Sequence, residues 1–97
     1  MTPASFSVLV TARFEREYRK ILAAHPEIAE HYRRVVEILS VDPYNRSRRY
    51  PIKKMIGVKP GDGLYRIRFL RFRFIYDIAS QVVYLKYWRL RREDTYN

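Results

Sequence analysis

The chain has 97 residues, of which 20 are Lys or Arg and 10 are Asp or Glu, so its formal net charge is +10. Hydrophobic residues make up 47% of the chain and aromatic residues 15%, which excludes an intrinsically disordered protein and predicts one small domain over residues 1–97. The absence of cysteine excludes disulfides, thiolate metal sites and a cysteine nucleophile. No apolar run approaches the roughly 18 residues of a membrane-spanning helix, and the first residues do not resemble a signal peptide. We therefore expect a cytoplasmic protein that does not act in a membrane.

The net positive charge lies in the second half of the chain. Residues 1–44 contain six basic and six acidic side chains, whereas residues 45–97 contain 14 basic and four acidic ones. Of the 20 cations, 15 are arginines, which suit bidentate phosphate contacts and stacking on bases. This distribution indicates a polyanionic partner: nucleic acid first, an acidic protein segment second, and an anionic membrane surface as a weaker third.

The first half predicts a strand followed by two helices. An apolar run at residues 6–10 favours a short strand, and Thr11 can cap a helix over residues 12–24, whose apolar side chains recur at helical spacing. Pro26 suits the first turn of a second helix, which Asp42 and Pro43 end. We expect the two helices to form a hairpin, followed by a basic loop.

From residue 52 the hydrophobic period changes from 3.6 to 2. Residues 52–56 predict an edge strand, in which Lys53 and Lys54 discourage pairing with another chain. After a turn that contains every glycine of the chain, three antiparallel strands are expected at residues 64–69, 72–78 and 82–88. The predicted fold class is α+β: an N-terminal strand, a two-helix hairpin, and a mainly antiparallel sheet with both helices packed on one face.

Strand parity brings three arginines together. Successive side chains of a strand point to opposite faces, so Arg66, Arg68 and Arg73 share the face opposite the apolar residues. If Leu70 and Arg71 form the turn between the strands, Arg68 lies directly opposite Arg73. Like charges in this position destabilise a sheet unless an anion lies between them, so the pair predicts an anion-binding site.

The same pairing argument, applied to the turn between the second and third of these strands, sets the register of the last strand. It pairs Tyr76 with Leu85, Phe74 with Tyr87, and Arg73 with Trp88. Trp88 would then lie beside the arginines on the charged face, where an aromatic ring could stack a base.

The polar tail over residues 89–97 adds further cations at the rim of this face. Its candidate functional residues are Arg89, Arg91, Arg92 and Tyr96. Tyr96 is either an anchor that packs the tail or a group that transfers a proton. The two histidines, His25 and His31, are expected to be structural. The carboxylates are not grouped to hold Mg²⁺, so we expect neither a metal nor a cofactor.

Two stretches resemble the RelE/ParE superfamily of toxins from type II toxin–antitoxin systems. GDGLYRIRFLRFRFIYDI, at residues 61–78, is similar to the family's arginine-rich hairpin, G-Y-R-(I/L)-R followed by (Y/F)-R-(V/I)-(I/L)-Y. RREDTY, at residues 91–96, resembles its ending, (H/R)-R-x-(D/E)-x-Y. The order of strand, helix hairpin and antiparallel sheet also matches across nearly the whole chain. The resemblance therefore implies a RelE-like fold of the microbial ribonuclease type.

The resemblance also implies an activity. RelE-like members inhibit translation by cleaving mRNA in the ribosomal A site without a metal, through attack of the ribose 2′-hydroxyl on the adjacent phosphate. The positions that match the family's catalytic residues are Arg66, Arg68, Arg73, Arg92 and Tyr96, with Arg91 as an alternative to Arg92. Arg73 would stabilise the pentacoordinate phosphate, Arg66 and Arg68 would orient the RNA backbone, and Tyr96 could take the 2′-hydroxyl proton. Further contacts with nucleic acid are expected from Lys53, Lys54, Arg71, Trp88, Arg89 and Arg91.

The expected partners are an acidic, RelB-like antitoxin that covers the basic face, together with the ribosome and mRNA. A ParE-like inhibitor of DNA gyrase is the alternative within the superfamily, because it shares the fold without needing a phosphate-cleaving set. A non-enzymatic nucleic-acid-binding protein is the alternative outside it. The complete basic set with Tyr96 favours RNA cleavage.

Overall fold

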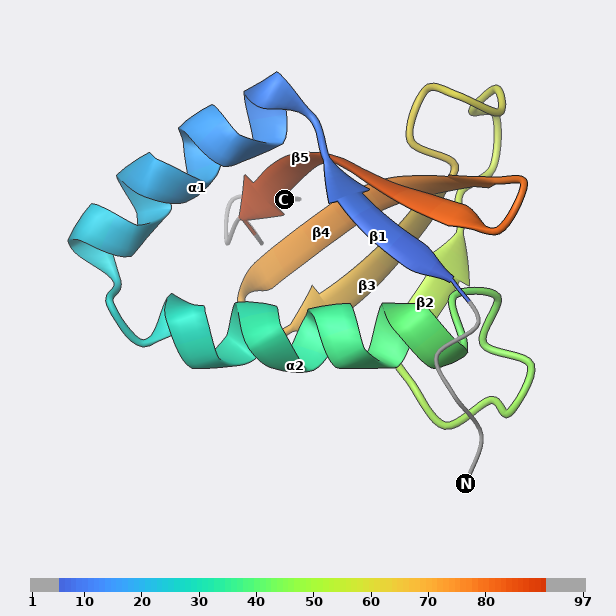
Figure 1. Ribbon diagram of the computed structural model, residues 1–97, viewed down its shortest axis with the longest axis horizontal. Helices are drawn as coiled ribbons and strands as arrows, with labels where there is room; N and C mark the ends of the chain where they lie inside the picture. Colours follow the sequence, from blue (N-terminus) through green and yellow to red (C-terminus); the bar gives the residue numbers. More distant parts are fainter. Residues whose placement is uncertain (1–5, 91–97) are drawn as a thin grey trace, which may run out of the picture.

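The computed structural model describes residues 6–90 of the chain. A short strand, β1 (Ser7–Val10), precedes two helices, α1 (Ala12–Ala24) and α2 (Ile28–Val41). Four further strands follow: β2 (Ile52–Lys54), β3 (Tyr65–Phe69), β4 (Phe72–Ala79) and β5 (Val82–Leu90). The strands form one sheet in the order β1-β5-β4-β3-β2, in which β1 is parallel to β5 and the other neighbours are antiparallel (Figure 1). The predicted α+β fold is confirmed.

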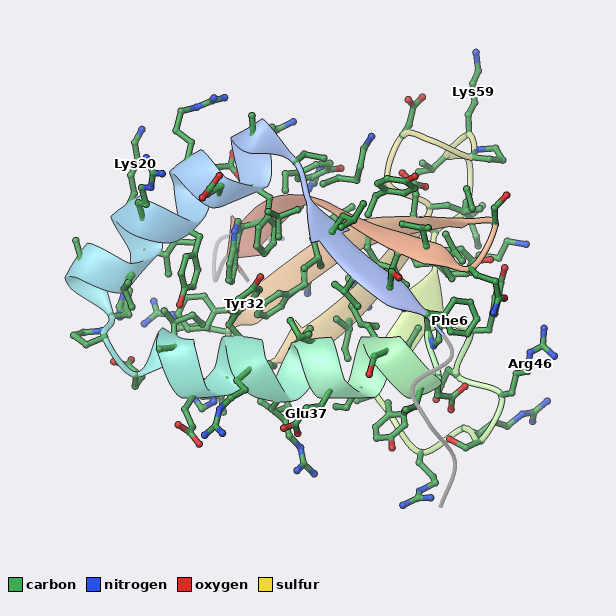
Figure 2. All side chains as sticks on the ribbon, in the orientation of Figure 1. Phe6, Lys20, Tyr32, Glu37, Arg46 and Lys59 are labelled. Carbon is green, nitrogen blue, oxygen red and sulfur yellow. The ribbon has the colours of Figure 1, made fainter. Side chains whose placement is uncertain are left out.

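Both helices pack on the same face of this sheet and enclose the hydrophobic core. Phe14 of α1 stacks on Trp88 of β5 with ring centroids 4.6 Å apart, and Tyr32 of α2 lies 5.8 Å from Phe14. Figure 2 shows Tyr32 in the space between the helices and the sheet, whereas Lys20 and Arg46 extend into solvent. The aromatic residues on the apolar faces of α1 and α2 therefore pack against the sheet in one core. Within residues 6–90, no helix is long and apolar enough to cross a membrane.

Several element boundaries differ from the prediction by one or two residues, and β5 continues to Leu90, so Arg89 lies in a strand and not in the predicted tail. α2 begins at Ile28 rather than at Pro26, because Pro26 and Glu27 form a turn that brings the Ile28 N–H within 2.9 Å of the His25 carbonyl oxygen. β2 ends at Lys54, because a turn with a positive φ at Gly57 follows it. The outer edge of the sheet is therefore shorter than predicted, as is common for edge strands.

Thr11 caps α1 as predicted and also fastens that helix to β5. Its Oγ1 accepts a hydrogen bond from the Phe14 N–H at 3.1 Å. The same hydroxyl lies 2.9 Å from the Lys86 carbonyl oxygen, and the Thr11 N–H donates to the Leu85 carbonyl oxygen at 3.0 Å. One side chain thus fixes the start of α1 against the middle of β5.

The middle of β5 contains a β-bulge, which the regular alternation of side chains along a strand does not predict. Tyr76 lies opposite Leu85, as predicted, but the preceding residue of β4, Ile75, lies opposite Tyr87. Lys86 is therefore the extra residue on β5, and the side chains beyond it change face.

The bulge overturns two predicted pairs. Phe74 lies opposite Trp88 rather than Tyr87, and Arg73 lies opposite Arg89 rather than Trp88. Trp88 is consequently a core residue, 7% exposed, whose indole Nε1–H donates to the Phe14 carbonyl oxygen at 3.2 Å. Its predicted place beside the arginines, as a surface for stacking bases, is wrong.

Candidate nucleic-acid interface

Three arginines form a row across three neighbouring strands on the sheet face that points away from the helices. Arg68 of β3 lies opposite Arg73 of β4, as parity predicted, and Arg73 lies opposite Arg89 of β5. We call these three residues the arginine row. Paired residues in an antiparallel sheet have Cβ atoms only about 4.5–5.5 Å apart, so three positive side chains are held side by side.

A second row lies next to the first on the same face. Arg66 of β3 is flanked by Lys53 of β2 on one side and by Ile75 of β4 on the other, and Ile75 in turn pairs with Tyr87 of β5. Because Arg66 precedes Arg68 by two residues, the two side chains point the same way. Five cations thus come from four strands on one face.

The guanidinium groups nearest the centre of this face have no hydrogen-bonding partner among residues 6–90. Within the described part of the chain, the Nε–H groups of Arg66 and Arg73 are buried and form no hydrogen bond. Burial, together with the neighbouring guanidinium groups of Arg73 and Arg68, lowers the pKa of Arg66. A buried donor without an acceptor costs about 1–3 kcal/mol, so an anion that accepts from these groups would bind favourably.

The ion pairs of the described residues lie elsewhere. They join Arg13 to Glu17, Arg19 to Glu15, Arg33 to Glu30 and His25 to Glu27, all within the helices and the turn between them. Over residues 6–90, no carboxylate lies within ion-pair distance of the arginine row or of Arg66. The same stretch has no group of three or more His, Asp or Glu side chains placed to hold a metal ion.

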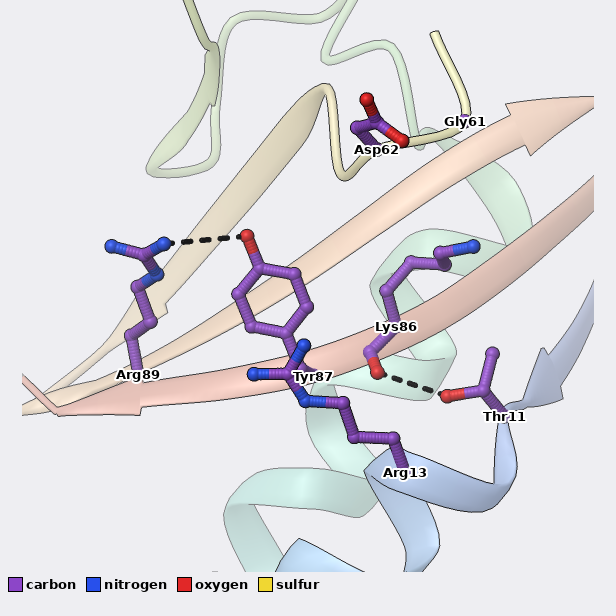
Figure 3. A pocket seen from close by; sticks show the side chains of 7 residues that line it. All are labelled: Thr11, Arg13, Gly61, Asp62, Lys86, Tyr87 and Arg89. Atoms are coloured by element: carbon purple, nitrogen blue, oxygen red, sulfur yellow. Dashed lines mark hydrogen bonds between the residues drawn. The ribbon is translucent and has the colours of Figure 1, made fainter. Parts of the chain in front are cut away.

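A pocket of about 490 Å³ adjoins the arginine row at Arg89. It is lined by residues of α1, β5 and the loop between β2 and β3: Thr11, Arg13, Gly61, Asp62, Lys86, Tyr87 and Arg89. In Figure 3 the Tyr87 ring stands between two arginines. The Cζ atom of Arg13 lies 4.2 Å from the ring centroid, and an Arg89 Nη2–H donates to the Tyr87 hydroxyl at 3.5 Å. The pocket thus combines positive charge with a flat aromatic surface.

The loop over residues 55–64 is held against the sheet by a buried carboxylate. Asp77 of β4, 6% exposed, accepts backbone hydrogen bonds from Gly61 at 3.1 Å, Gly63 at 2.8 Å and Leu64 at 2.9 Å. At Gly63 the backbone comes so close to Ile75 that an added Cβ would lie 2.5 Å from its Cγ2 atom. These contacts fix the segment that supplies Gly61 and Asp62 to the pocket.

The structure brings some of the predicted site residues together on one face and places others elsewhere. Arg66, Arg68, Arg73, Arg89 and Lys53 lie on one face. Three other predicted contacts do not join them. Lys54 pairs with Tyr65 and therefore lies on the opposite face of the sheet. Arg71 is exposed in the turn between β3 and β4, and Trp88 is in the core. The predicted roles of Arg91, Arg92 and Tyr96 fall outside the described residues. The histidines pack edge-on against phenylalanines, His25 on Phe72 and His31 on Phe69.

Sequence reasoning missed Tyr87, Arg13 and Asp62. Regular alternation along β5 places Tyr87 in the core, because it does not anticipate the bulge. A signal was available, since Leu85 and Trp88 are both large and apolar yet stand three residues apart, which a regular strand would place on opposite faces. No local pattern identifies Arg13 or Asp62, because packing between distant segments brings them to the pocket.

Of three comparisons with known proteins, the one with solved structures gives a match. No protein-family model matches the sequence, and no curated protein matches it. Among solved structures, the crystal structure of the archaeal RelE–RelB complex from Pyrococcus horikoshii OT3 contains a chain that matches with a TM-score of 0.63 and 18% sequence identity. The match covers 92% of this chain and 98% of that chain. The chain therefore has the RelE-like fold that its element order and residues 61–78 predict.

Proposed function

We propose that this protein is the toxin of a type II toxin–antitoxin system and that it cleaves mRNA on the ribosome, in the cytoplasm, without a metal ion. The observation that carries the proposal is the arginine row with its neighbour Arg66. Four guanidinium groups converge on one sheet face, two of them have buried Nε–H groups without a partner, and no carboxylate of residues 6–90 neutralises them. Such a face is suited to a phosphate that gains negative charge during reaction.

The proposed chemistry assigns a role to each arginine. The ribose 2′-oxygen attacks the adjacent phosphorus, the bond from phosphorus to the 5′-oxygen breaks, and the 5′-oxygen takes a proton from water. The products are a 2′,3′-cyclic phosphate and a 5′-hydroxyl. Arg73, at the centre of the row, stabilises the additional negative charge of the pentacoordinate phosphate. Arg66 and Arg68 hold the RNA backbone in line for attack.

Proton transfer needs groups other than these arginines. Guanidinium groups stay protonated near neutral pH and cannot act as a general base. In this proposal Tyr96 takes the proton from the 2′-hydroxyl, and Arg92, or alternatively Arg91, assists at the phosphate. These assignments rest on the match of residues 91–96 to the family's ending.

The partners follow from the same charge distribution. An acidic antitoxin would cover the arginine row and neutralise it, and the matched RelE–RelB structure supports a RelB-like protein in this role. The loop cations Arg46, Arg48, Arg49 and Lys59 are exposed and suit attraction to ribosomal RNA.

The decisive experiment compares two variants, each of which lacks one arginine. Arg73→Ala should lower the rate of mRNA cleavage by about 10²–10³-fold, measured by primer extension on translated mRNA after induction, because it removes a donor that stabilises the transition state. Arg34→Ala is the matched control: Arg34 is exposed on α2, on the other side of the sheet, and should leave cleavage unchanged. Wild-type cleavage by Arg73→Ala would refute the assignment.

The alternative of a ParE-like gyrase inhibitor is separated by a different readout. Induction would then give gyrase-dependent breaks in DNA while translated mRNA stays intact. That result would show that gyrase inhibition, and not RNA cleavage, is the function of this protein.

A further inference from the structure

We propose that the pocket beside Tyr87 binds the nucleobase next to the phosphate held by the arginine row, and that Asp62 makes it favour bases carrying an amino group over uracil. The inference rests on the proposed function, because it requires single-stranded RNA as the ligand. It adds a base-binding subsite and a source of sequence preference on this face.

The pocket and the arginine row are parts of one continuous surface. Arg89 belongs to both, since it lines the pocket and lies opposite Arg73 on the neighbouring strand. Adjacent strands are about 4.8 Å apart, so a nucleotide whose phosphate is at Arg73 has its base or its neighbour's base within reach of the pocket.

The pocket offers a flat surface for stacking. The Arg13 guanidinium lies over the Tyr87 ring, with its Cζ atom 4.2 Å from the ring centroid. The Arg89 Cζ atom lies 5.4 Å from the same centroid. Planar guanidinium groups and aromatic rings are the surfaces on which proteins stack the bases of single-stranded RNA.

The surface is held in place before any ligand binds. Glu17 accepts from the Arg13 Nε–H at 3.0 Å with one carboxylate oxygen and from the Trp88 backbone N–H at 3.0 Å with the other. The bulge turns Tyr87 toward the pocket, and the Thr11 hydroxyl lies 2.9 Å from the Lys86 carbonyl oxygen at that bulge, as the dashed line in Figure 3 shows. Little ordering is therefore left to occur on binding.

Asp62 supplies the preference. It is the acidic residue among the seven that line a pocket with three cations, and within residues 6–90 its carboxylate forms no hydrogen bond or ion pair. A carboxylate accepts hydrogen bonds from the amino groups of adenine, cytosine and guanine. Uracil presents a carbonyl oxygen on each side of its single N–H, so a carboxylate facing that edge is repelled. Asp77 fixes the backbone on both sides of Asp62 and thereby its position.

The test uses short RNAs that cannot be cleaved. The probes are fluorescent pentanucleotides with 2′-fluoro sugars, all uracil except for a single A, C or G placed at each position in turn, and affinity is measured by anisotropy. The wild-type protein should show one position at which A, C and G each bind at least about fivefold tighter than U. Asp62→Asn should reduce that ratio to less than twofold. Glu37→Gln, which removes the same charge from the outer side of α2, should keep it (Figure 2).

A second pair of variants tests the stacking surface. Arg13→Ala should weaken binding of the preferred pentanucleotide by about fivefold or more, since stacking on one base is worth at least that much. Arg16→Ala, which removes an exposed arginine from the same helix but not from the pocket, should weaken it much less. Arg13→Lys keeps the charge and should still lose most of the affinity, because an ammonium has no planar face.

The outcomes separate the pocket from the proposed function. A wild-type protein with no base preference at any position, or an Asp62→Asn variant that keeps the preference, would refute the pocket. The proposed function would stand if Arg73→Ala still lowers the rate of mRNA cleavage by about 10²–10³-fold. If Arg73→Ala cleaves translated mRNA at the wild-type rate, the proposed function is refuted, whereas a base preference that Asp62→Asn removes would still support the pocket.

Discussion

Replacing Asp77 with asparagine removes the anchor of the loop that precedes β3. In the native protein one carboxylate oxygen accepts from the Gly61 and Leu64 N–H groups, and the other accepts from the Gly63 N–H at 2.8 Å. Asparagine is nearly isosteric but has only one acceptor oxygen. If that oxygen keeps the first two bonds, the amide NH₂ points at the buried Gly63 N–H, so one donor loses its partner.

The expected loss of stability follows from these contacts. An unsatisfied buried donor costs about 1–3 kcal/mol, and the remaining two bonds lose the strengthening that a charged acceptor gives. We expect Asp77→Asn to lower the free energy of unfolding by about 2–4 kcal/mol. For a domain of this size, that corresponds to a melting temperature lower by roughly 10–25 °C.

The assay is urea denaturation followed by circular dichroism, with Asp62→Asn as the matched control. Asp62 lies in the same loop, but it is exposed, so its substitution should change stability by less than about 0.5 kcal/mol. If Asp77→Asn is also within about 0.5 kcal/mol of the wild type, the carboxylate does not anchor the loop, and the reasoning fails.

Three further substitutions and the dependence of stability on pH test contacts at specific atoms. Gly63→Ala should destabilise the protein by about 2–4 kcal/mol in the same denaturation assay, because φ is +89° there and the new Cβ would lie 2.5 Å from Ile75 Cγ2. Gly61→Ala has a similar φ of +98° but no atom within 4 Å, so it should cost only about 1 kcal/mol, and equal losses would contradict the packing argument. Tyr76→Phe should cost about 1 kcal/mol, because the buried hydroxyl donates to the Pro43 carbonyl oxygen at 2.7 Å. Burial raises the pKa of Tyr76 above its ordinary value near 10, so the folded state favours the neutral phenol. The wild type should therefore lose stability as the pH rises above about 10, when the unfolded chain ionises there, and Tyr76→Phe should show a shallower loss.

The sequence predicted the centre of the candidate site because that centre depends on local rules. β3 and β4 are joined by a two-residue turn, so alternation along two adjacent strands is enough to place Arg68 opposite Arg73 and Arg66 on the same face. The same alternation, combined with the helical period of α1 and α2, identified which side of the sheet is the core.

That reasoning failed at β5, where a single extra residue changed the outcome. With Lys86 as a bulge, every side chain after it moves to the other face: Trp88 enters the core, Tyr87 leaves it, and Arg89 joins Arg68 and Arg73. Burying the large indole against Phe14 is favourable, whereas the regular register would have left it among the arginines. The choice between the two registers thus depends on a contact with α1, more than seventy residues earlier in the chain.

Two kinds of information therefore define this protein. The sequence by itself determined the α+β class, the order of the elements, and the gathering of Arg66, Arg68 and Arg73, because side-chain direction in helices and strands follows from spacing alone. Only the tertiary structure decided that Arg89 completes the row and that Tyr87, Arg13 and Asp62 form a pocket beside it. Those positions depend on a bulge and on a loop tied to Asp77, whose energies come from contacts between segments far apart in the chain.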